Sequence, residues 1–338
     1  MTATPSPVRL AAIGLNHSHI YGMAAHLVEA GAEMAAVHAV EPELREPFAQ
    51  RYPDARIAAT AQEIYEDESI DVVLTAAIPS ERAGIAMAAM EHGKDVQSDK
   101  AGMTTLTQWQ EVRDVQATTG CIYSVAYSER FGSKATLRAL ELVKAGAVGD
   151  VVHLMGTGPH SLRKPTRPNW FFRRDTAGGI LCDIAAHQCD QYLAFSGETD
   201  PIVIKSQVAN RAHPDTPEFE DFGDMLVRGG STVGYFRVDW FTPTGLASWG
   251  DTRLTVVGTE GYIEVRKNLD LAGRAGGDHL FVTDSATTRY EDCSGVQLTF
   301  GHDFLADVRN RTETAMSQEH CFKAMHLALT AQAQADRI

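Results

Sequence analysis

The stretch that decides the fold is VRLAAIGLNHSHI, residues 8–20, in which an apolar run ends at Gly14 and passes into a helical segment. The run Val8–Ile13 has the length and the continuous apolar character of a strand that is buried on both faces. The helical segment extends to about Ala30 and ends at Gly31, because glycine readily adopts the left-handed conformation that terminates a helix. The stretch therefore predicts a strand, a tight turn and a helix.

The same alternation of strand and helix continues to about residue 126. The predicted strands are Met34–Val40, Ile70–Ile78, Asp95–Ser98 and Ile122–Ala126, and the predicted helices are Pro42–Tyr52, Glu81–His92 and Thr104–Thr119. Strands joined by helical crossovers are parallel, and their sheet carries helices on both faces. We therefore expect residues 1–126 to form a doubly wound α/β domain that binds a dinucleotide.

The pattern changes after residue 127, where strand-like runs follow one another without helical crossovers. Val151–Met155 is a predicted strand ahead of the helix Gly179–Phe195. The runs without crossovers are Ile202–Val208, Phe222–Arg228, Thr232–Trp240, Arg253–Val257, Tyr262–Arg266 and His279–Thr283. Helices are predicted near Ser133–Ala145, Gly179–Phe195, Asp303–Arg311 and Gln318–Ala335. Such a meander forms one broad, mainly antiparallel sheet. We expect residues 127–338 to form a second, α+β domain for substrate binding and oligomerisation, with the last helix able to pack back on the first domain.

The composition excludes several classes of protein. Of 338 residues, 44% are hydrophobic and 22% are charged, which is typical of a globular protein. Acidic residues outnumber basic ones by 44 to 30, and this net charge of −14 disfavours binding to nucleic acid or to an anionic membrane. Five cysteines without a CxxC pair predict reduced thiols in a cytoplasmic protein. Residues 1–9 lack the apolar run of a signal peptide, and no segment is expected to span a membrane.

The first strand–helix turn is the expected cofactor site, because ligands of open parallel sheets bind beyond the carboxyl ends of the strands. The fingerprint G-x-G-x-x-G would fall on Gly14, Asn16 and His19, so only its first glycine is present. Asn16 adds bulk where the backbone approaches the pyrophosphate, and His19 loosens the packing of helix on strand. The alternative is an ordinary turn that binds no cofactor.

Glu41 stands where the acidic residue of such a site is expected, some 20 residues after the glycine turn. A carboxylate there suits the ribose 2′-hydroxyl of NAD, whereas Arg45 could instead meet the 2′-phosphate of NADP. We expect NAD, with NADP as the alternative. The competing interpretation of Glu41 is an ordinary acidic residue of the surface.

Lys100 follows the strand Asp95–Ser98 and so lies at the same carboxyl edge as Gly14 and Pro79. A lone lysine is most often solvated surface, but three features at one edge favour a site. The residues that we expect to contact the cofactor are Gly14, Asn16, His17, Ser18, His19, Glu41, Ile78, Pro79 and Lys100. No metal is expected, because the alternating His17 and His19 just after a strand could point apart, and no cysteine or carboxylate partner stands nearby.

The helix Gly179–Phe195 carries a narrow polar stripe. At 100° per residue, Asp183, His187 and Asp190 fall within about 60° of one another, and most of the remaining circumference is apolar. A surface helix would show a wide polar face, so the stripe favours a wet cleft. The alternative is a structural His–Asp pair.

Three segments resemble the Gfo/Idh/MocA family (glucose–fructose oxidoreductase and inositol dehydrogenase) over nearly the whole chain. Residues 93–101, GKDVQSDKA, are similar to its G-K-H-V-x-x-E-K-P segment, and residues 178–187, GGILCDIAAH, to its G-G-x-L-x-D-x-G-x-H helix. Residues 258–261 match its G-T-E-G turn. The chain departs from the family at Asp99, which replaces Glu, at Ala101, which replaces Pro, and in the eroded glycine fingerprint.

The resemblance implies a Rossmann domain, an open-faced sheet domain, and the catalytic set Lys100, Asp183 and His187. It implies hydride transfer between NAD(P) and a hydroxyl or carbonyl group of a sugar, polyol or sugar acid. In that reaction a neutral His187 takes the hydroxyl proton, Lys100 stabilises the alkoxide and Asp183 orients the substrate or the histidine. It also implies a homodimer or homotetramer paired through the open sheet.

Two other functions stay open at this point. Bound NAD could assist elimination, epimerisation or glycoside cleavage, or the chain could be a ligand-binding protein that has lost turnover. The basic loop ahead of the polar helix could meet an anionic substrate or be solvated. Its cations are Arg163, Lys164, Arg167, Arg173 and Arg174.

Overall fold

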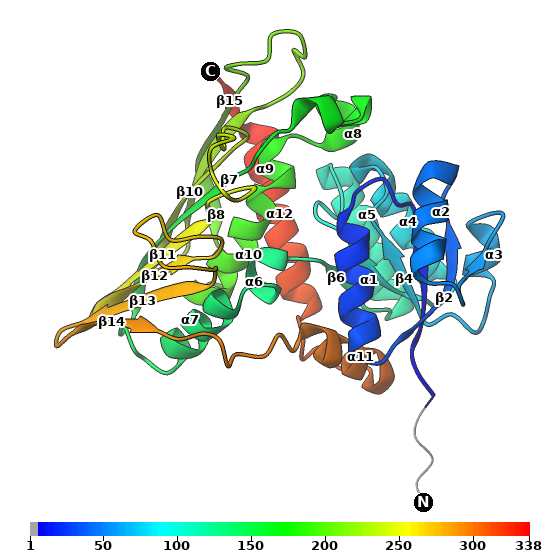
Figure 1. The fold of residues 1–338 in the computed structure, drawn as a ribbon, viewed down its shortest axis with the longest axis horizontal. Helices are drawn as coiled ribbons and strands as arrows, with labels where there is room; N and C mark the ends of the chain where they lie inside the picture. Colours follow the sequence, from blue (N-terminus) through cyan, green and yellow to red (C-terminus); the bar gives the residue numbers. More distant parts are fainter. Residues whose placement is uncertain (1–5) are drawn as a thin grey trace, which may run out of the picture. The chain divides into compact units, whose positions relative to one another are not determined.

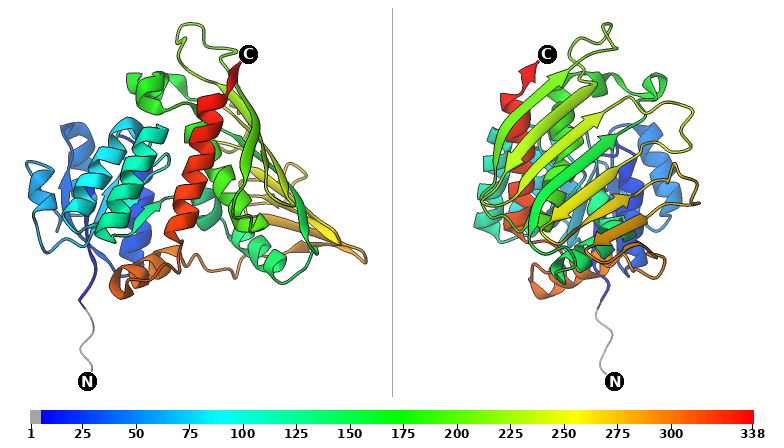
Figure 2. Two further views of the ribbon diagram at one scale, coloured as in Figure 1. Left: turned by 180° about the vertical axis from the view of Figure 1, so that it is seen from behind. Right: turned by 90° about the vertical axis from the view of Figure 1, so that its left-hand side faces the viewer.

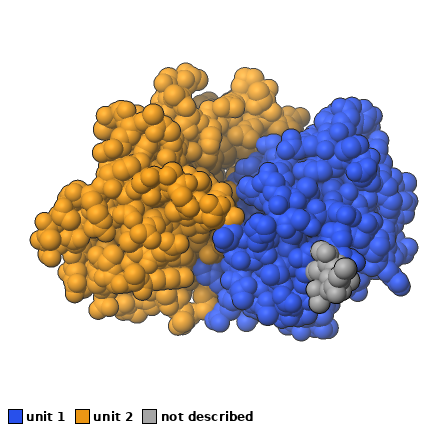
Figure 3. Space-filling model, turned by 60° about the horizontal axis from the view of Figure 1, so that its bottom comes forward, with its two compact units in different colours: residues 1–126, 299–322 blue, residues 127–298, 323–338 orange. Residues whose placement is uncertain are grey.

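The computed structural model describes residues 6–338. Of residues 1–9, from which we expect no signal peptide, residues 1–5 therefore lie outside the described residues. The chain divides into two compact units, coloured separately in Figure 3. Unit 1 is Met1–Ala126 with Thr299–Phe322, and unit 2 is Tyr127–Leu298 with Lys323–Ile338. Residues 299–322, which we expected in the second domain, therefore belong to unit 1.

Unit 1 is built on a six-stranded, fully parallel sheet of order β3-β2-β1-β4-β5-β6 (Figure 1). Its strands are β1 (Arg9–Ile13), β2 (Glu33–His38), β3 (Arg56–Ile57), β4 (Val72–Thr75), β5 (Asp95–Ser98) and β6 (Tyr123–Val125). Its helices are α1 (His19–Glu29), α2 (Pro42–Arg51), α3 (Gln62–Tyr65), α4 (Pro79–Glu91), α5 (Leu106–Thr119) and α11 (Phe300–Asn310). The strand order reverses between β1 and β4, which is where a doubly wound sheet binds its ligand. The predicted doubly wound fold is confirmed.

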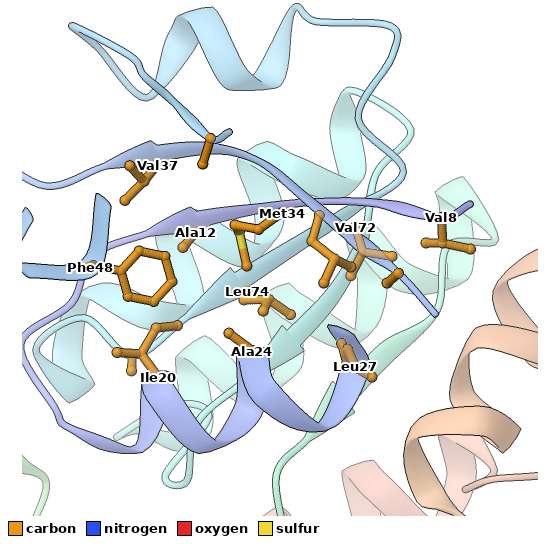
Figure 4. Close-up of a cluster of buried hydrophobic side chains, with 14 of the residues drawn as sticks. Val8, Ala12, Ile20, Ala24, Leu27, Met34, Val37, Phe48, Val72 and Leu74 are labelled. Carbon is orange, nitrogen blue, oxygen red and sulfur yellow. The ribbon is translucent and has the colours of Figure 1, made fainter. Parts of the chain in front are cut away.

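The core of unit 1 lies between α1 and the sheet (Figure 4). Ile20, Ala24 and Leu27 recur at helical spacing on α1 and are fully buried against strand residues such as Leu74. Burying a side chain of the size of Ile20 or Leu27 contributes about 1.5–3 kcal/mol. Phe304, Leu305 and Val308 of α11 join the same cluster, which explains why residues 299–322 belong to unit 1.

Unit 2 is built on a nine-stranded mixed sheet of order β14-β13-β12-β11-β7-β10-β9-β8-β15. Its strands are β7 (Val151–Pro159), β8 (Ile202–Ala209), β9 (Phe222–Arg228), β10 (Val233–Asp239), β11 (Arg253–Gly258), β12 (Gly261–Arg266), β13 (His279–Asp284), β14 (Thr288–Glu291) and β15 (Asp336–Arg337). Only the pairs β7–β10 and β8–β15 are parallel. The predicted mainly antiparallel sheet is confirmed. The two edge strands β14 and β15 were missed, because they are short and polar.

Helices cover one face of this sheet, and none of the helices within residues 6–338 covers the other face (Figure 2). The helices of unit 2 are α6 (Ser128–Phe131), α7 (Lys134–Lys144), α8 (Arg174–Ala177), α9 (Ile180–Asp183), α10 (Ala185–Ser196) and α12 (Gln318–Gln334), the last of which begins in unit 1. On β7, Gly156 and Gly158 face Gln188 of α10. Met155 points to the uncovered face and is 46% exposed. Among residues 6–338, no helix combines the length and the apolar character that crossing a bilayer requires.

Candidate active site

The carboxylate of Asp99 is the centre of a buried polar network at the carboxyl edge of the unit 1 sheet. Its side chain is fully buried, and its Oδ2 lies 3.1 Å from Nη2 of Arg82, which is itself 1% exposed. Nδ1 of His17 lies 2.9 Å from Oδ2, and Nδ1 of His19 lies 2.9 Å from Oδ1. The Arg82 guanidinium and the two imidazoles hold the pKa of Asp99 well below its usual range, although burial opposes them. Asp99 is therefore a buried carboxylate anion with three nitrogen partners.

Arg82 extends the network to the next two turns. Its Nε donates to the carbonyl of Ala77 at 2.7 Å, and its Nη1 donates to the carbonyls of Lys100 at 2.5 Å and Ala101 at 3.0 Å. The turns after β1, β4 and β5 are thus joined through one ion pair. The sequence analysis missed Arg82, which looked like an ordinary helix residue. Two features of the sequence could have indicated a buried ion pair. Arg82 lies on the largely apolar helix α4, and an acidic residue, Asp99, directly precedes Lys100.

Gly14 brings the first turn against the second. Its φ is +73°, and a Cβ at this position would collide with the side chain of Ala77. The amide of His17 donates to the carbonyl of Ala76 at 2.8 Å, and the amide of Ala76 donates to the carbonyl of Gly14 at 3.1 Å. Only the first glycine of the fingerprint is therefore demanded by backbone geometry.

The pair His17 and His19 does not diverge as we expected. Both imidazoles face Asp99, and their ligand atoms and a carboxylate oxygen lie within 4.8 Å of one another. The statement that no carboxylate stands nearby was therefore wrong, because Asp99 is remote in sequence but adjacent in the fold. The three groups have the composition of a metal site. Arg82 already occupies the carboxylate, however, and its positive charge opposes a second cation.

The remaining predicted cofactor contacts surround this network. Ser18 is exposed and precedes α1, and its side chain leaves the first turn of the helix uncapped. Uncapped amides at a helix start favour an anion such as a pyrophosphate. Ile78 precedes α4, and Pro79 is the first residue of that helix.

Glu41 precedes α2 and receives a hydrogen bond from Nδ2 of Asn16 at 2.9 Å. Burial and the neighbouring Glu41 raise the pKa of Glu81, a second acidic residue at this edge that the sequence analysis did not identify. Arg45 donates to the carbonyl of Ala39 at 3.4 Å. Asn16, which replaces the second glycine of the fingerprint, thus holds the Glu41 side chain in place through this hydrogen bond. These residues are compatible with a dinucleotide that carries a free ribose hydroxyl.

In unit 2 the predicted helix Gly179–Phe195 is divided at Ile184 into α9 and α10. The amides of Leu181 and Cys182 are capped by Oε1 of Gln332 at 2.8 and 3.2 Å. Gly179 has a φ of +95°, and a Cβ there would be too close to the Gln332 side chain. This close approach explains Gly179, whereas the preceding Gly178 ends α8 in a left-handed conformation with φ of +86°.

Of the polar stripe, Asp183 is half-buried and His187 is 2% exposed, with its ring edge-on to Tyr127 at 6.3 Å between centroids. Asp190 has a different role. Arg130 donates to both its carboxylate oxygens at 2.6 to 3.1 Å, and Asp190 is fully buried. The interpretation of Asp190 as part of a wet stripe was therefore wrong, because it forms a structural ion pair. The structure places Lys100 in unit 1 and the pair Asp183 and His187 in unit 2.

A cavity of about 410 Å³ in unit 2 is lined by Pro159, Phe222, Arg237, Asp239, Phe241, Thr242, Pro243, Leu246 and Asp251. None of the predicted site residues lines it. All five cysteines lie within the described residues and are buried, and none of them forms a disulfide.

The His17 environment predicts an acid-sensitive fold. Burial, with a smaller contribution from His19, lowers the pKa of His17 from 6.5 to about 4. Between pH 6.5 and 4 the unfolded chain therefore binds a proton that the folded chain does not, so stability falls as the pH falls through this window. The expected loss is about 3 kcal/mol of unfolding free energy by pH 4.

Urea unfolding from pH 7.5 to 4 measures this effect in the wild type and in His17→Asn. We expect a flatter profile for His17→Asn than for the wild type. The exposed His26→Gln is the control and keeps the wild-type profile. Parallel profiles for wild type and His17→Asn would contradict the prediction.

Residues 8–127 match a family model described as an oxidoreductase family with an NAD-binding Rossmann fold. Residues 136–264 match the GFO/IDH/MocA C-terminal domain. A solved structure from Erwinia carotovora atroseptica SCRI1043 is 45% identical, with a TM-score of 0.95, and the match covers 98% of this chain and 99% of that one.

Two curated relatives are more distant. Levoglucosan dehydrogenase of Pseudarthrobacter phenanthrenivorans is 26% identical over 278 residues, which are 78% of this chain and 66% of that protein. A scyllo-inositol 2-dehydrogenase (NADP(+)) of Bacillus subtilis is 24% identical over 188 residues, 54% of this chain and 52% of that protein. The chain spans about half the length of the curated relatives that it matches first. The chain belongs to the Gfo/Idh/MocA family of oxidoreductases, and unit 1 carries that family's NAD-binding Rossmann fold.

Proposed function

We propose that the protein is an NAD(P)-dependent dehydrogenase that acts on a secondary hydroxyl or carbonyl group of a sugar, polyol or sugar acid. The observation that carries the proposal is the Asp99 network, which joins the three turns of an NAD-binding fold and holds the backbone of Lys100 among them. A second support is the Asp183–His187 segment on a capped helix of unit 2. Relatives named as inositol and levoglucosan dehydrogenases support the substrate class.

Each residue has a separate task in this proposal. The bound dinucleotide supplies the hydride acceptor or donor. A neutral His187 accepts the hydroxyl proton of the substrate, since imidazole titrates near neutral pH. The ammonium group of Lys100 stabilises the developing alkoxide, and Asp183 orients the substrate or His187. Gly14, Asn16, Ser18 and Glu41 are proposed to hold the dinucleotide.

Substitution of the two residues proposed to act on the reacting hydroxyl tests the proposal. His187→Ala and Lys100→Ala should each lower the turnover number for oxidation of a sugar or polyol by roughly a hundredfold or more. This corresponds to an increase of about 2.7 kcal/mol in the activation free energy. Dinucleotide affinity should change little in His187→Ala. The double variant should be far less impaired than the product of the two single losses, because residues that act on one group are not additive.

Absorbance of the reduced nicotinamide, with a panel of sugars and polyols, gives the turnover. The exposed residues Lys144→Ala and His302→Ala are matched controls that keep wild-type turnover. Unchanged turnover in either site variant, with an intact circular dichroism spectrum, would remove that residue from the reaction. Dinucleotide binding without net turnover of any substrate would favour redox-assisted elimination, epimerisation or hydrolysis, or a protein that only binds its ligand.

Cofactor choice gives a further prediction. We expect NAD to bind more tightly than NADP, because Glu41 and the adjacent Glu81 repel a 2′-phosphate. Glu41→Gln keeps a side chain that can bond to Asn16 but removes one negative charge. It should reduce the preference for NAD roughly tenfold, about 1.4 kcal/mol. Calorimetric titration of both cofactors measures this, with Glu43→Gln as the exposed control on the same helix. Tighter NADP binding by the wild type would make Arg45 the governing group.

We also propose that the uncovered face of the nine-stranded sheet pairs with a second copy to give a homodimer or homotetramer. Met155, Tyr235 and Tyr262 are 46, 38 and 43% exposed on that face. They lie on β7, β10 and β12, and an apolar surface without a cover favours association.

Light scattering at micromolar concentration should give at least twice the chain mass of 36.8 kDa. Tyr235→Glu with Met155→Asp should shift the protein toward monomer, because each buries a charge at the interface. Leu271→Asp, at an exposed apolar residue of a loop, is the control. A monomer mass for the wild type would refute this interface.

A further inference from the structure

The basic loop between β7 and α9 carries five cations, and the structure separates them into two groups. Three are held by carboxylates of unit 2: Lys164 by Asp215 at 2.6 Å, Arg173 by Asp175 at 2.6 Å, and Arg174 by Glu220 at 2.5 Å. The other two, Arg163 and Arg167, have no carboxylate within ion-pair distance among the described residues. These two are not explained by the internal stability of the loop.

Arg167 is fixed in place without its charge being neutralised. Its guanidinium carbon lies 4.5 Å from the ring centroid of Phe171 and 5.3 Å from that of Trp240, both buried rings. Its Nε donates to the carbonyl of Leu162 at 2.9 Å. In the part of the chain that the structure describes, its two Nη groups have no hydrogen-bond partner. Two stacking contacts and one backbone bond thus hold a planar fork whose outer nitrogens remain available.

Arg167 and Arg163 are electrostatically coupled to each other and to Asp183. Burial lowers the pKa of Arg167, the neighbouring charge of Arg163 lowers it further, and the Asp183 carboxylate raises it. The backbone of Arg163 adopts a left-handed conformation with φ of +49°, which few residues with a side chain adopt. Such strained positions cluster at ligand sites. Two neighbouring cations without a carboxylate partner therefore lie in the electrostatic range of a predicted catalytic residue.

We propose that Arg163 and Arg167 form an anion subsite and that the substrate is a sugar acid whose carboxylate they bind. This inference rests on the proposed dehydrogenase function and narrows its substrate class. A planar guanidinium fork matches the two oxygens of a carboxylate. The Asp183 carboxylate also acts electrostatically on Arg167, so it disfavours a doubly charged phosphate more than a singly charged carboxylate.

The subsite has a second consequence for the reaction. A carboxylate held by Arg167 fixes one end of the substrate. The hydroxyl that reacts is therefore a ring or chain hydroxyl whose distance from the carboxylate is constant among good substrates. Neutral sugars and polyols lack this anchor, so they should bind weakly and in several poses.

The test uses the full chain with NADH bound, so that no hydroxyl group of a probe can be oxidised. Calorimetry measures the binding of D-gluconate and D-glucuronate against their neutral counterparts D-glucitol and D-glucose, with D-glucose 6-phosphate as the phosphate probe. We expect at least one carboxylate probe to bind tenfold or more tightly than its neutral counterpart and than the phosphate. Initial rates with NAD give the same order in kcat/KM.

The variants identify the group responsible. Arg167→Met should weaken carboxylate binding by tenfold to a hundredfold and leave neutral probes unchanged, and Arg167→Lys should recover part of the loss because it restores charge without the fork. Arg163→Gln, at an exposed position, should weaken carboxylate binding without affecting the fold. Arg173→Gln in the same loop is the control and binds all probes like the wild type.

The outcomes separate this inference from the proposed function. Carboxylate probes that bind no more tightly than their neutral counterparts, or an Arg167→Met loss that is equal for both classes, would overturn the anion subsite. Oxidation of neutral polyols in that case leaves the dehydrogenase function intact. Conversely, Arg167-dependent carboxylate binding without oxidation of any probe supports the subsite and contradicts the dehydrogenase function.

Discussion

The buried ion pair between Asp99 and Arg82 is the interaction on which the arrangement of unit 1 depends. It joins the turns after β1, β4 and β5, because Asp99 holds His17 and His19 while Arg82 holds the carbonyls of the other two turns. Removing two charges from water is costly, and only a full set of partners offsets the cost. Here Arg82 donates to three carbonyl oxygens, and each carboxylate oxygen of Asp99 has an imidazole nitrogen at 2.9 Å. The members of this network therefore fix the backbone position of Lys100 and the conformation of the histidine turn together, and neither can move without exposing or unpairing a charge.

This network also explains how a turn without the second and third glycines keeps its shape. In the usual fingerprint, small residues let the turn approach its surroundings closely. Here only Gly14 meets that steric demand, since a Cβ would collide with Ala77. The larger side chains at the second and third glycine positions form hydrogen bonds instead: Asn16 with Glu41, and His19 with Asp99. Polar contacts thus replace close backbone packing, at the expense of sensitivity to the protonation state of the imidazoles.

The sequence was informative where a pattern is local and uninformative where a partner is remote. Strand–helix alternation predicted the parallel sheet and its carboxyl edge, because apolar periodicity reports burial directly. The same reasoning could not connect His19 with Asp99, which are 80 residues apart, and so it missed the carboxylate beside the two histidines. It also placed Asp190 on a solvated polar stripe. Helical spacing shows which residues share a helix face, but it does not show that Arg130 donates hydrogen bonds to Asp190. Strand ends and helical spacing singled out Lys100, Asp183 and His187, and the family resemblance gave these residues their catalytic roles.

Unit 2 shows the same dependence on remote partners at the start of α9. Glu220 accepts from the amide of Ile180 at 3.0 Å and is also bonded by Gln332, which caps the next two amides. Both residues lie far along the chain, so the direction of the Asp183–His187 segment is set by the residues just before β9 and by α12 rather than by its own sequence. In this arrangement the positive charge of Arg174 is neutralised by its ion pair with Glu220. A basic residue next to a site is therefore not evidence for an anionic ligand until its internal partners are known. By this criterion Arg174 is not a candidate for binding an anionic ligand, whereas Arg163 and Arg167, which have no carboxylate partner among residues 6–338, are candidates.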